Sequence, residues 1–331
     1  ECESGNDYND QFMGIRISSI FVILVTSTFA ALFPVLSSRY SFIKLPSWCF
    51  FICKYFGTGV ILATTFIHLL TPAVEYLGHE CLGGTFAEYP WAFAITFMTL
   101  VILFFIEMVI YHYIKNFSNS SSAPVSQPLI ESNQDSIDED KKVSLDKDLE
   151  NSKIDPTDLG SFTGQLISIF VLEFGIIFHS VFVGLALAVS GDEFKTLYVV
   201  IVFHQVFEGL GLGARIAITD WPKEKRFTPY VLALGYGLST PISIAIGLGV
   251  RNSYSPGSRT ALITNGIFDS ISAGILLYTS IVELMAHELL FTEEFDNKPE
   301  DASHKGTKKM FAAYGLLCLG GLLMALLGKW A

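Results

Sequence analysis

Long apolar windows alternate with short polar segments along almost the whole chain. Eight of these windows are long enough to cross the hydrocarbon core of a bilayer, roughly 30 Å, as helices that rise about 1.5 Å per residue. They cover residues 13–36, 47–72, 91–114, 161–190, 196–218, 228–250, 260–290 and 308–328. Their apolar residues run on without the alternation of a membrane-barrel strand. The pattern therefore predicts an all-α, polytopic membrane protein with eight transmembrane helices.

The amino-acid composition agrees with a bilayer as the solvent. Of the 331 residues, 51% are hydrophobic and only 16% are charged, whereas a soluble domain carries about 25% charged residues. The net charge of −11 also gives no basic surface of the kind that binds nucleic acid. An ordinary soluble domain and a nucleic-acid-binding protein are thereby excluded.

One long segment breaks the apolar pattern. Residues 115–160 are rich in Ser, Asp, Glu, Asn and Lys, a composition too polar to form a core. We expect this segment to be a disordered cytoplasmic loop. It separates the first three spans, at 13–114, from the last five, within 161–331, and residues 1–12 form an N-terminal tail.

The placement of basic residues predicts the orientation of the spans. Lys and Arg gather in the loops that follow the first, third, fifth and seventh spans, and loops with such an excess stay in the cytoplasm. Both termini should then be extracellular. Cys2 and Cys81 both fall on this outer, oxidising side, so we expect a disulfide between them.

Two polar side chains interrupt the fifth window, "VIVFHQVFEGLGLGARI" at 200–216. His204 and Glu208 lie on one helix face about 6 Å apart, a spacing that lets an imidazole and a carboxylate bind one ion. His179 in the preceding window reaches a similar depth near the midplane. We call His179, His204 and Glu208 the midplane set; its donors suit Zn²⁺, Fe²⁺ or Mn²⁺. The alternative is a buried His–Glu hydrogen bond that only fastens helices together.

Further ionisable side chains lie at other depths of the predicted bundle. They are His68 and Glu75 near the outer end of the second span, Glu107 and His112 near the inner end of the third, and Glu283, His287 and Glu288 near the inner end of the seventh. Because such groups are expensive to bury in a membrane, they are functional candidates, here as stepping stones for a cation. Arg215 lies near the inner interface, where we expect it to snorkel to lipid headgroups.

Several of these residues stand in motifs of a known family. "HSVFVG" at 179–184 and "FHQVFEGLGLGARI" at 203–216 resemble the paired fourth- and fifth-span signature of the ZIP (Zrt/Irt-like) metal transporters, and "FIHLLTPAVE" at 66–75 resembles their second span. The terminal "MALLGKWA" looks like the fungal and plant uptake branch. The resemblance covers essentially the whole chain. It implies a 3+2+3 bundle, in which an inverted repeat relates spans one to three with spans six to eight.

The resemblance also implies roles for individual residues. The midplane set matches the principal metal position of the family. Ser180 and Gln205 match positions that complete a second, adjacent metal site in some members. Val183 stands where two-metal members have a glutamate, so we expect one well-formed site and at most a weak second one.

We therefore expect a secondary transporter that imports a divalent metal into the cytoplasm by alternating access to the midplane set. Zn²⁺ is the first choice of cargo, and an iron or manganese importer of the same family, or Cd²⁺ as cargo, is left open. The chain has no Walker-type motif for nucleotide drive. We expect it in the plasma membrane. Homodimer formation is left open, as is ubiquitin attachment to the lysines of the cytoplasmic loop.

Two rival interpretations come from other classes of protein. An intramembrane zinc metalloenzyme would also bury His and Glu, but the sequence contains no His-Glu-x-x-His motif. A structural or receptor-like membrane protein would depend on no metal at all. The sequence favours a transporter over an enzyme.

Overall fold

The computed structural model describes residues 11–121, 156–219, 221–290 and 305–330, together with a few isolated residues near the N-terminus and around position 295. The chain forms two compact units. The larger unit comprises Glu1–Leu103 and Ser168–Ala331, and the smaller unit comprises Phe104–Ile167. All the candidate site residues belong to the larger unit except Glu107 and His112.

Long helices account for all of the expected spans. They are α1 (Met13–Arg39), α2 (Ser47–Thr64) continued by the π-helical segment η2 (Thr65–Leu70) and α3 (Thr71–Leu77), α5 (Trp91–Ser121), α7 (Pro156–Val189), α8 (Phe194–Ile218), α9 (Thr228–Val250), α10 (Arg259–Tyr278) continued by the π-helical segment η4 (Thr279–Leu290), and α11 (Lys305–Leu327). The short elements are η1 (Ser41–Ile43), α4 (Thr85–Glu88) and η3 (Lys223–Lys225). In the part of the chain that the structure describes, 8 helices are long and apolar enough to cross a bilayer, and there is no strand. The predicted all-α fold with eight spans is confirmed.

The second span is longer than the apolar pattern indicates. It was expected to end at residue 72, but η2 and α3 carry it on to Leu77. In η2 the amide of Thr71 bonds to the carbonyl of Phe66, five residues back. This wider turn accommodates Pro72, which has no N–H to donate. The proline therefore does not end the span.

The long polar segment also differs from the expectation at both of its ends. Helix α5 continues to Ser121, and helix α7 begins at Pro156, so the two ends of the segment expected to be a disordered loop are helical. Residues 122–155 lie outside the described residues. Each of these helices extends a membrane span into the polar segment.

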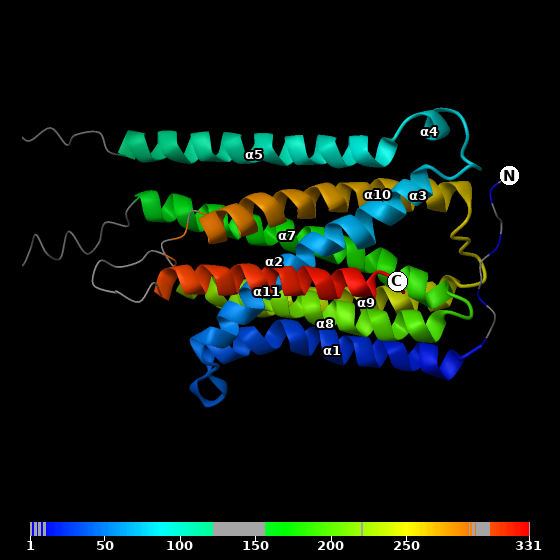
Figure 1. Cartoon of the computed structure of the whole chain (residues 1–331), viewed down its shortest axis with the longest axis horizontal. Coiled ribbons are helices and arrows are strands. Elements are labelled where there is room, and N and C mark those ends of the chain that lie inside the picture. Colours follow the sequence, from blue (N-terminus) through cyan, green and yellow to red (C-terminus); the bar gives the residue numbers. More distant parts are fainter. Residues whose placement is uncertain are drawn as a thin grey trace, which may run out of the picture. The chain divides into compact units, whose positions relative to one another are not determined.

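Glycines allow the helices of the larger unit to approach closely (Figure 1). A Cβ atom on Gly57 of α2 would collide with the backbone of Gly211 on α8, and a Cβ on Gly213 would collide with the backbone of Ala31 on α1. Only glycine leaves the space that these two crossings require. In a membrane, where lipid competes equally well for apolar side chains, such close backbone packing drives helix association. Helix α8 therefore lies against both α1 and α2.

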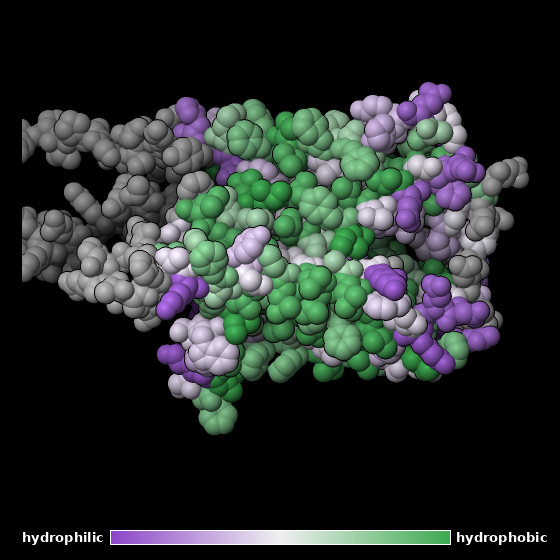
Figure 2. Space-filling view, viewed as in Figure 1, coloured by the Kyte–Doolittle hydropathy of each residue, from purple (hydrophilic) through white to green (hydrophobic). Residues whose placement is uncertain are grey.

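The surface of the larger unit is what a lipid environment requires. Large apolar side chains project outward from α1, and Phe21, Val25 and Phe29 are each more than 60% exposed. On the face shown in Figure 2, hydrophobic residues cover the middle of the helices and hydrophilic residues gather toward their ends. The spans thus present apolar side chains to lipid along their length.

The two ends of the larger unit have different chemistry. At one end, Cys2 and Cys81 form the predicted disulfide, and we call this the disulfide end. At the other end lie the connections 40–46 and 219–227, which the side chain of Arg39 joins by donating to the carbonyl of Arg226 at 2.8 Å. We call this the basic end, because Lys44, Lys223 and Lys225 also lie in these connections. Successive spans run alternately between the two ends.

The second and seventh spans share an unusual feature. Each begins as an α-helix and changes to a π-helix, in η2 and in η4. π-helical turns are rare and frequently mark functional sites. These spans would be counterparts in an inverted repeat of spans one to three and six to eight, and that repeat remains a prediction.

Candidate metal centre

His204 and Glu208 lie one turn apart in the middle of α8. The Nε2 atom of His204 is 3.3 Å from an Oε1 atom of Glu208. Their side chains are only 3% and 1% exposed. His204 lies ten residues from the start of α8 at Phe194, or about 15 Å along the helix. The pair is therefore buried near the middle of the span.

Two more imidazoles lie beside this pair. The ring of His179, on α7, has its centroid 5.7 Å from that of His204. The ring of His68, on η2, lies edge-on to His204 with a centroid distance of 4.9 Å. The structure thus brings together all three members of the midplane set and adds His68, so that the second, fourth and fifth spans each contribute.

The position of His68 differs from the expectation. The sequence placed it near the outer end of the second span, as a stepping stone above the site. Because that span continues to Leu77, His68 lies nine residues inside its end and reaches the same depth as His204. It is a direct neighbour of the midplane set.

Buried polar atoms without hydrogen-bond partners are concentrated around the midplane set. Both ring nitrogens of His179, Nε2 of His204 and both carboxylate oxygens of Glu208 lack a hydrogen bond to the described residues. The same holds for the side-chain polar atoms of Ser180, Gln205, Thr64 and Thr240, and Ser180 and Gln205 are fully buried. Four helices, α2, α7, α8 and α9, supply these atoms. Buried polar groups are nearly always paired in folded proteins, so this concentration requires an explanation.

The donors do not form a closed coordination shell as they lie. Among the described residues, no group of three or more His, Cys, Asp or Glu side chains is close enough to enclose a metal ion. His204 and Glu208 are already in contact, whereas the ring centroid of His179 is 5.7 Å from that of His204. Binding an ion would require His179 to move toward the pair.

Side-chain hydrogen bonds to backbone carbonyls hold the helices together around the site. Pro241 interrupts the hydrogen bonding of α9, because it has no N–H to offer the carbonyl of Gly237. The hydroxyl of Ser27, on α1, donates to that carbonyl at 3.1 Å. The phenol of Tyr236 donates to the backbone carbonyl of Gln205 at 2.6 Å. Helix α9 is thereby held against both α1 and α8 at the level of the site.

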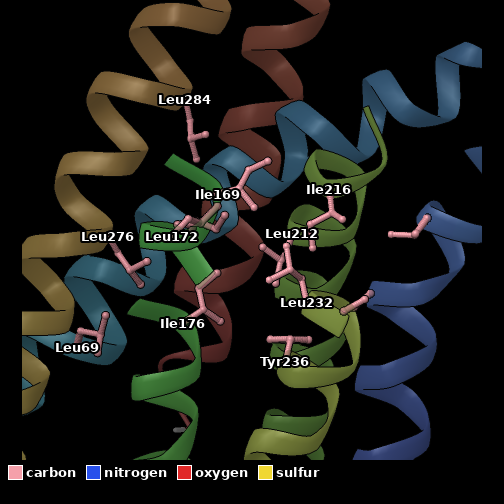
Figure 3. Close-up of a cluster of buried hydrophobic side chains, with 14 of the residues drawn as sticks. Leu69, Ile169, Leu172, Ile176, Leu212, Ile216, Leu232, Tyr236, Leu276 and Leu284 are labelled. Carbon is pink, nitrogen blue, oxygen red and sulfur yellow. The ribbon is translucent and has the colours of Figure 1, made fainter. Parts of the chain in front are cut away.

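Apolar side chains fill the space between the site and the basic end. Ile176 of α7 and Leu212 of α8 begin this packing, each about one turn from the midplane set. Figure 3 shows labelled members of the cluster pointing toward one another from several helices; they include Leu172, Ile216, Leu276 and Leu284. Val183, in contrast, packs against a separate cluster nearer the disulfide end. Apolar packing thus separates the midplane set from the basic end.

The candidates on the seventh span lie away from the midplane set, toward the basic end. Glu283 and Glu288 are partly buried, and His287 is exposed. Glu288 is 2.7 Å from Nη1 of Arg215. The expectation that Arg215 snorkels to lipid headgroups is therefore wrong, because its side chain is only 5% exposed and pairs with a carboxylate on another span.

The remaining candidates and one missed residue complete the comparison with the sequence. Glu107 and His112 belong to the smaller unit. Thr64 lies next to Glu208, although sequence reasoning did not single it out. It stands four residues before His68, so the helical repeat puts both side chains on one face. That spacing was the signal that could have found it.

Comparisons with known proteins extend the picture to the whole chain. A family model described as ZIP Zinc transporter matches residues 13–328. The chain is 43% identical to zinc-regulated transporter 2 of Saccharomyces cerevisiae, over 100% of this chain and 97% of that protein. It is 34% identical to zinc transporter 3 and 29% identical to Fe(2+) transport protein 2, both of Arabidopsis thaliana; each match covers 100% of this chain, with 89% and 92% of the respective relative.

The eight-span fold and these matches define a class of protein, the multi-pass membrane transporters, and not an enzyme. Within that class the chain belongs to the ZIP zinc transporter family. The resemblance seen in the motifs of the fourth and fifth spans is confirmed.

Proposed function

We propose that this protein is a secondary transporter that carries a divalent metal ion, Zn²⁺ first, across the membrane by way of the midplane set. One observation carries the proposal: buried donor atoms without hydrogen-bond partners are gathered from four helices near the middle of the spans. An ion bound among them would satisfy these atoms. A purely structural His204–Glu208 contact would explain neither the unpaired nitrogens of His179 nor the second carboxylate oxygen of Glu208.

The donor types favour a borderline divalent ion. His179, His204 and His68 offer three imidazoles, and Glu208 offers a carboxylate. Four nitrogen and oxygen ligands are the usual number for zinc, and the same ligands also suit Fe²⁺ and Mn²⁺. In this proposal His179 moves toward His204 as the ion loses its water. His68 then completes the set from the second span.

Neutral oxygen donors next to the midplane set supply a second, weaker position. Ser180 and Gln205 each follow a member of the set by one residue, and Thr240 of α9 adds a buried hydroxyl without a hydrogen-bond partner among the described residues. Because none of these side chains carries a charge, they bind a cation less strongly than Glu208 does. Val183 adds only an apolar side chain, which agrees with one well-formed site.

The names of the relatives support zinc as the cargo. Zinc-regulated transporter 2 and zinc transporter 3 are named for zinc. A second candidate cargo is Fe²⁺, and the observation that favours it is the similarity to Fe(2+) transport protein 2. Mn²⁺ and Cd²⁺ could use the same ligands and remain competitors. The shared donor chemistry makes selectivity a question for measurement.

The direction of transport follows from the two ends of the larger unit. A disulfide is stable in an oxidising compartment, and cytoplasmic loops carry the excess of Lys and Arg. The disulfide end then faces outward at the plasma membrane and the basic end faces the cytoplasm, so transport toward the basic end is import. Both termini lie outside in this orientation.

Release toward the cytoplasm requires the apolar packing beyond the site to separate. Leu212 and Ile176 stand between the midplane set and the basic end. In alternating access, one group of helices moves against another and exposes the same site first to one side and then to the other. Glu283 and His287 lie farther along in that direction, and we propose that they receive the ion before it leaves.

Zinc uptake by proteoliposomes tests the site. Purified protein is reconstituted, and uptake of radioactive zinc is measured for the wild type, His204→Ala, Glu208→Gln and the matched control His79→Ala, which alters an exposed histidine at the disulfide end. Mutating a group that only supports a metal ligand already lowers metal affinity by about 10- to 100-fold. Removing a ligand itself should therefore lower uptake at subsaturating zinc by at least about tenfold. Normal uptake by correctly inserted His204→Ala would refute the proposed site.

Competition in the same vesicles separates the two candidate cargoes. Uptake of radioactive zinc is measured with excess Fe²⁺ under reducing conditions, and with Mn²⁺ or Cd²⁺. Zinc as the cargo predicts that unlabelled Zn²⁺ competes at a lower concentration than Fe²⁺. The reverse order would assign the protein to iron.

A further inference from the structure

An ion pair between the buried Arg215 and the partly buried Glu288 ties three spans together near the basic end. Arg215 of α8 donates to Glu288 of η4 at 2.7 Å and 3.4 Å, and to the hydroxyl of Thr58 of α2 at 2.6 Å. On the same side, the hydroxyl of Tyr55 donates to the backbone carbonyl of Glu288 at 3.3 Å, and Nζ of Lys54 lies 3.9 Å from its carboxylate. The fifth span is thus linked by side chains to both the second and the seventh.

This arrangement is not what stability alone would select. An arginine at the membrane interface can extend its charged group into water while its stem covers apolar surface. Here Arg215 is instead withdrawn into the bundle and is only 5% exposed. Burying two charges costs desolvation energy that their attraction roughly repays, so apolar residues would hold the helices together equally well. An ion pair is useful where two helices must switch between two discrete positions, one in which the charged side chains are in contact and one in which they are apart.

The ion pair stands in register with the apolar packing that closes the site. Leu212 precedes Arg215 by three residues, Leu284 precedes Glu288 by four, and Ile61 follows Thr58 by three. Residues three or four apart share one face of a helix, and all three apolar residues belong to the cluster between the midplane set and the basic end. Separating the charged side chains therefore separates Leu212, Leu284 and Ile61 as well.

The seventh span is less regular than the second and fifth spans at the level of the ion pair. Helices α2 and α8 are in backbone contact at Gly57 and Gly211, one residue before Thr58 and four residues before Arg215, so they form a firm pair. Glu288, in contrast, lies on η4, where π-helical hydrogen bonding replaces the α-helical pattern. Interruptions of this kind are where helices bend. The ion pair of Arg215 and Glu288 therefore joins the closely packed helices α2 and α8 to the π-helical segment η4.

We propose that Arg215 and Glu288 are the two halves of an ionic gate that closes the transport path toward the basic end. The gate is closed in this structure. It opens when η4 moves away from α2 and α8, which parts the apolar side chains one turn deeper and gives the midplane set access to the basic end. Its role in transport rests on the proposed function, whereas its opening can be measured without any metal.

Cysteine labelling reports whether the gate is open. Cys53 lies on α2 next to Lys54, at the level of the gate, and is partly buried. In a background with Cys49→Ser and Cys318→Ser, purified protein is treated with a charged maleimide. Glu288→Gln and Arg215→Gln should each raise the labelling rate of Cys53 severalfold, because each breaks the ion pair between the fifth and seventh spans. The exposed basic-end variant Arg226→Gln is the matched control and should label like the wild type.

Reversal of the pair separates a gate from a structural contact. Combining Arg215→Glu with Glu288→Arg restores opposite charges, so it should return both the labelling rate and zinc uptake toward wild-type values, while Arg215→Glu alone should show the largest increase in labelling. Unchanged labelling in both neutral variants would overturn the proposal, and so would a failure of the reversed pair to restore it. Zinc binding by the purified variants, measured by equilibrium dialysis, should stay at the wild-type level. If the wild type itself bound no zinc, the proposed function would fail while the labelling result still decided the gate.

Discussion

Replacing Gln205 by methionine should make the metal-free protein more stable. Gln205 is completely buried, and neither its amide nitrogen nor its amide oxygen has a hydrogen-bond partner among the described residues. An unpaired buried polar group costs about 1–3 kcal/mol. Methionine has nearly the same length and no such group, so Gln205→Met should raise the free energy of unfolding by about 2 kcal/mol. For a chain of this size the melting temperature should rise by about 3 °C.

The control is a neighbouring polar side chain whose bonds are satisfied. The hydroxyl of Ser243, on α9, donates to the carbonyl of Thr240 at 2.9 Å and lies 3.3 Å from the carbonyl of Ser180. Ser243→Ala removes these bonds without removing an unpaired atom. It should lower the melting temperature, opposite in sign to Gln205→Met. Both are measured by thermal unfolding of purified protein in a chelator.

Zinc should narrow the difference in stability between the wild type and Gln205→Met. A ligand that binds only the folded state at 100 times its Kd stabilises by about 2.7 kcal/mol. Wild type should gain this amount on addition of zinc. Gln205→Met should gain less if the amide oxygen contributes to binding. A lower melting temperature of metal-free Gln205→Met, similar to that of Ser243→Ala, would refute the idea that the site stores unsatisfied donors.

Three further predictions test the fold and the cargo. Gly211→Ala should reduce zinc uptake because its Cβ would collide with the backbone of Gly57, whereas Gly315→Ala, which faces open space, should transport normally in the same assay. Cys2→Ser removes a disulfide that spans 79 residues of sequence and should cost at most about 4.5 kcal/mol of unfolding free energy; a reducing agent should lower the melting temperature of the wild type and leave that of the variant unchanged. Glu283→Gln should slow the maximal rate of zinc uptake more than it weakens zinc binding by the purified protein, and an equal effect on both would contradict its place beyond the midplane set.

The spans and the disulfide could be predicted because each depends on information that is local in sequence. A window of about 20 apolar residues defines a span wherever its neighbours lie. Alternating the spans across the membrane then puts Cys2 and Cys81 on one side without any knowledge of packing. The common depth of His179 and His204 follows in the same way, by counting residues from the ends of adjacent helices.

Contacts that depend on helix rotation could not be predicted. Arg215 and Glu288 are 73 residues apart, and only the packed bundle decides that their side chains face each other. Viewed alone, Arg215 is an arginine near a helix end, for which lipid headgroups are the default partner. The depth of His68 was misjudged for a different reason: the apolar window ends at residue 72, whereas the helix continues through a π-helical turn to Leu77.

The helix that carries His204 and Glu208 is unbroken from Phe194 to Ile218, unlike the spans with π-helical segments. Arg215 projects from the same helix, seven residues beyond Glu208, which is about 10 Å along its axis. A rigid rod transmits a tilt at one point to every other point along it. In the proposed mechanism, a metal ion that displaces His204 and Glu208 would therefore also shift Arg215, and with it the contact of Arg215 with Glu288.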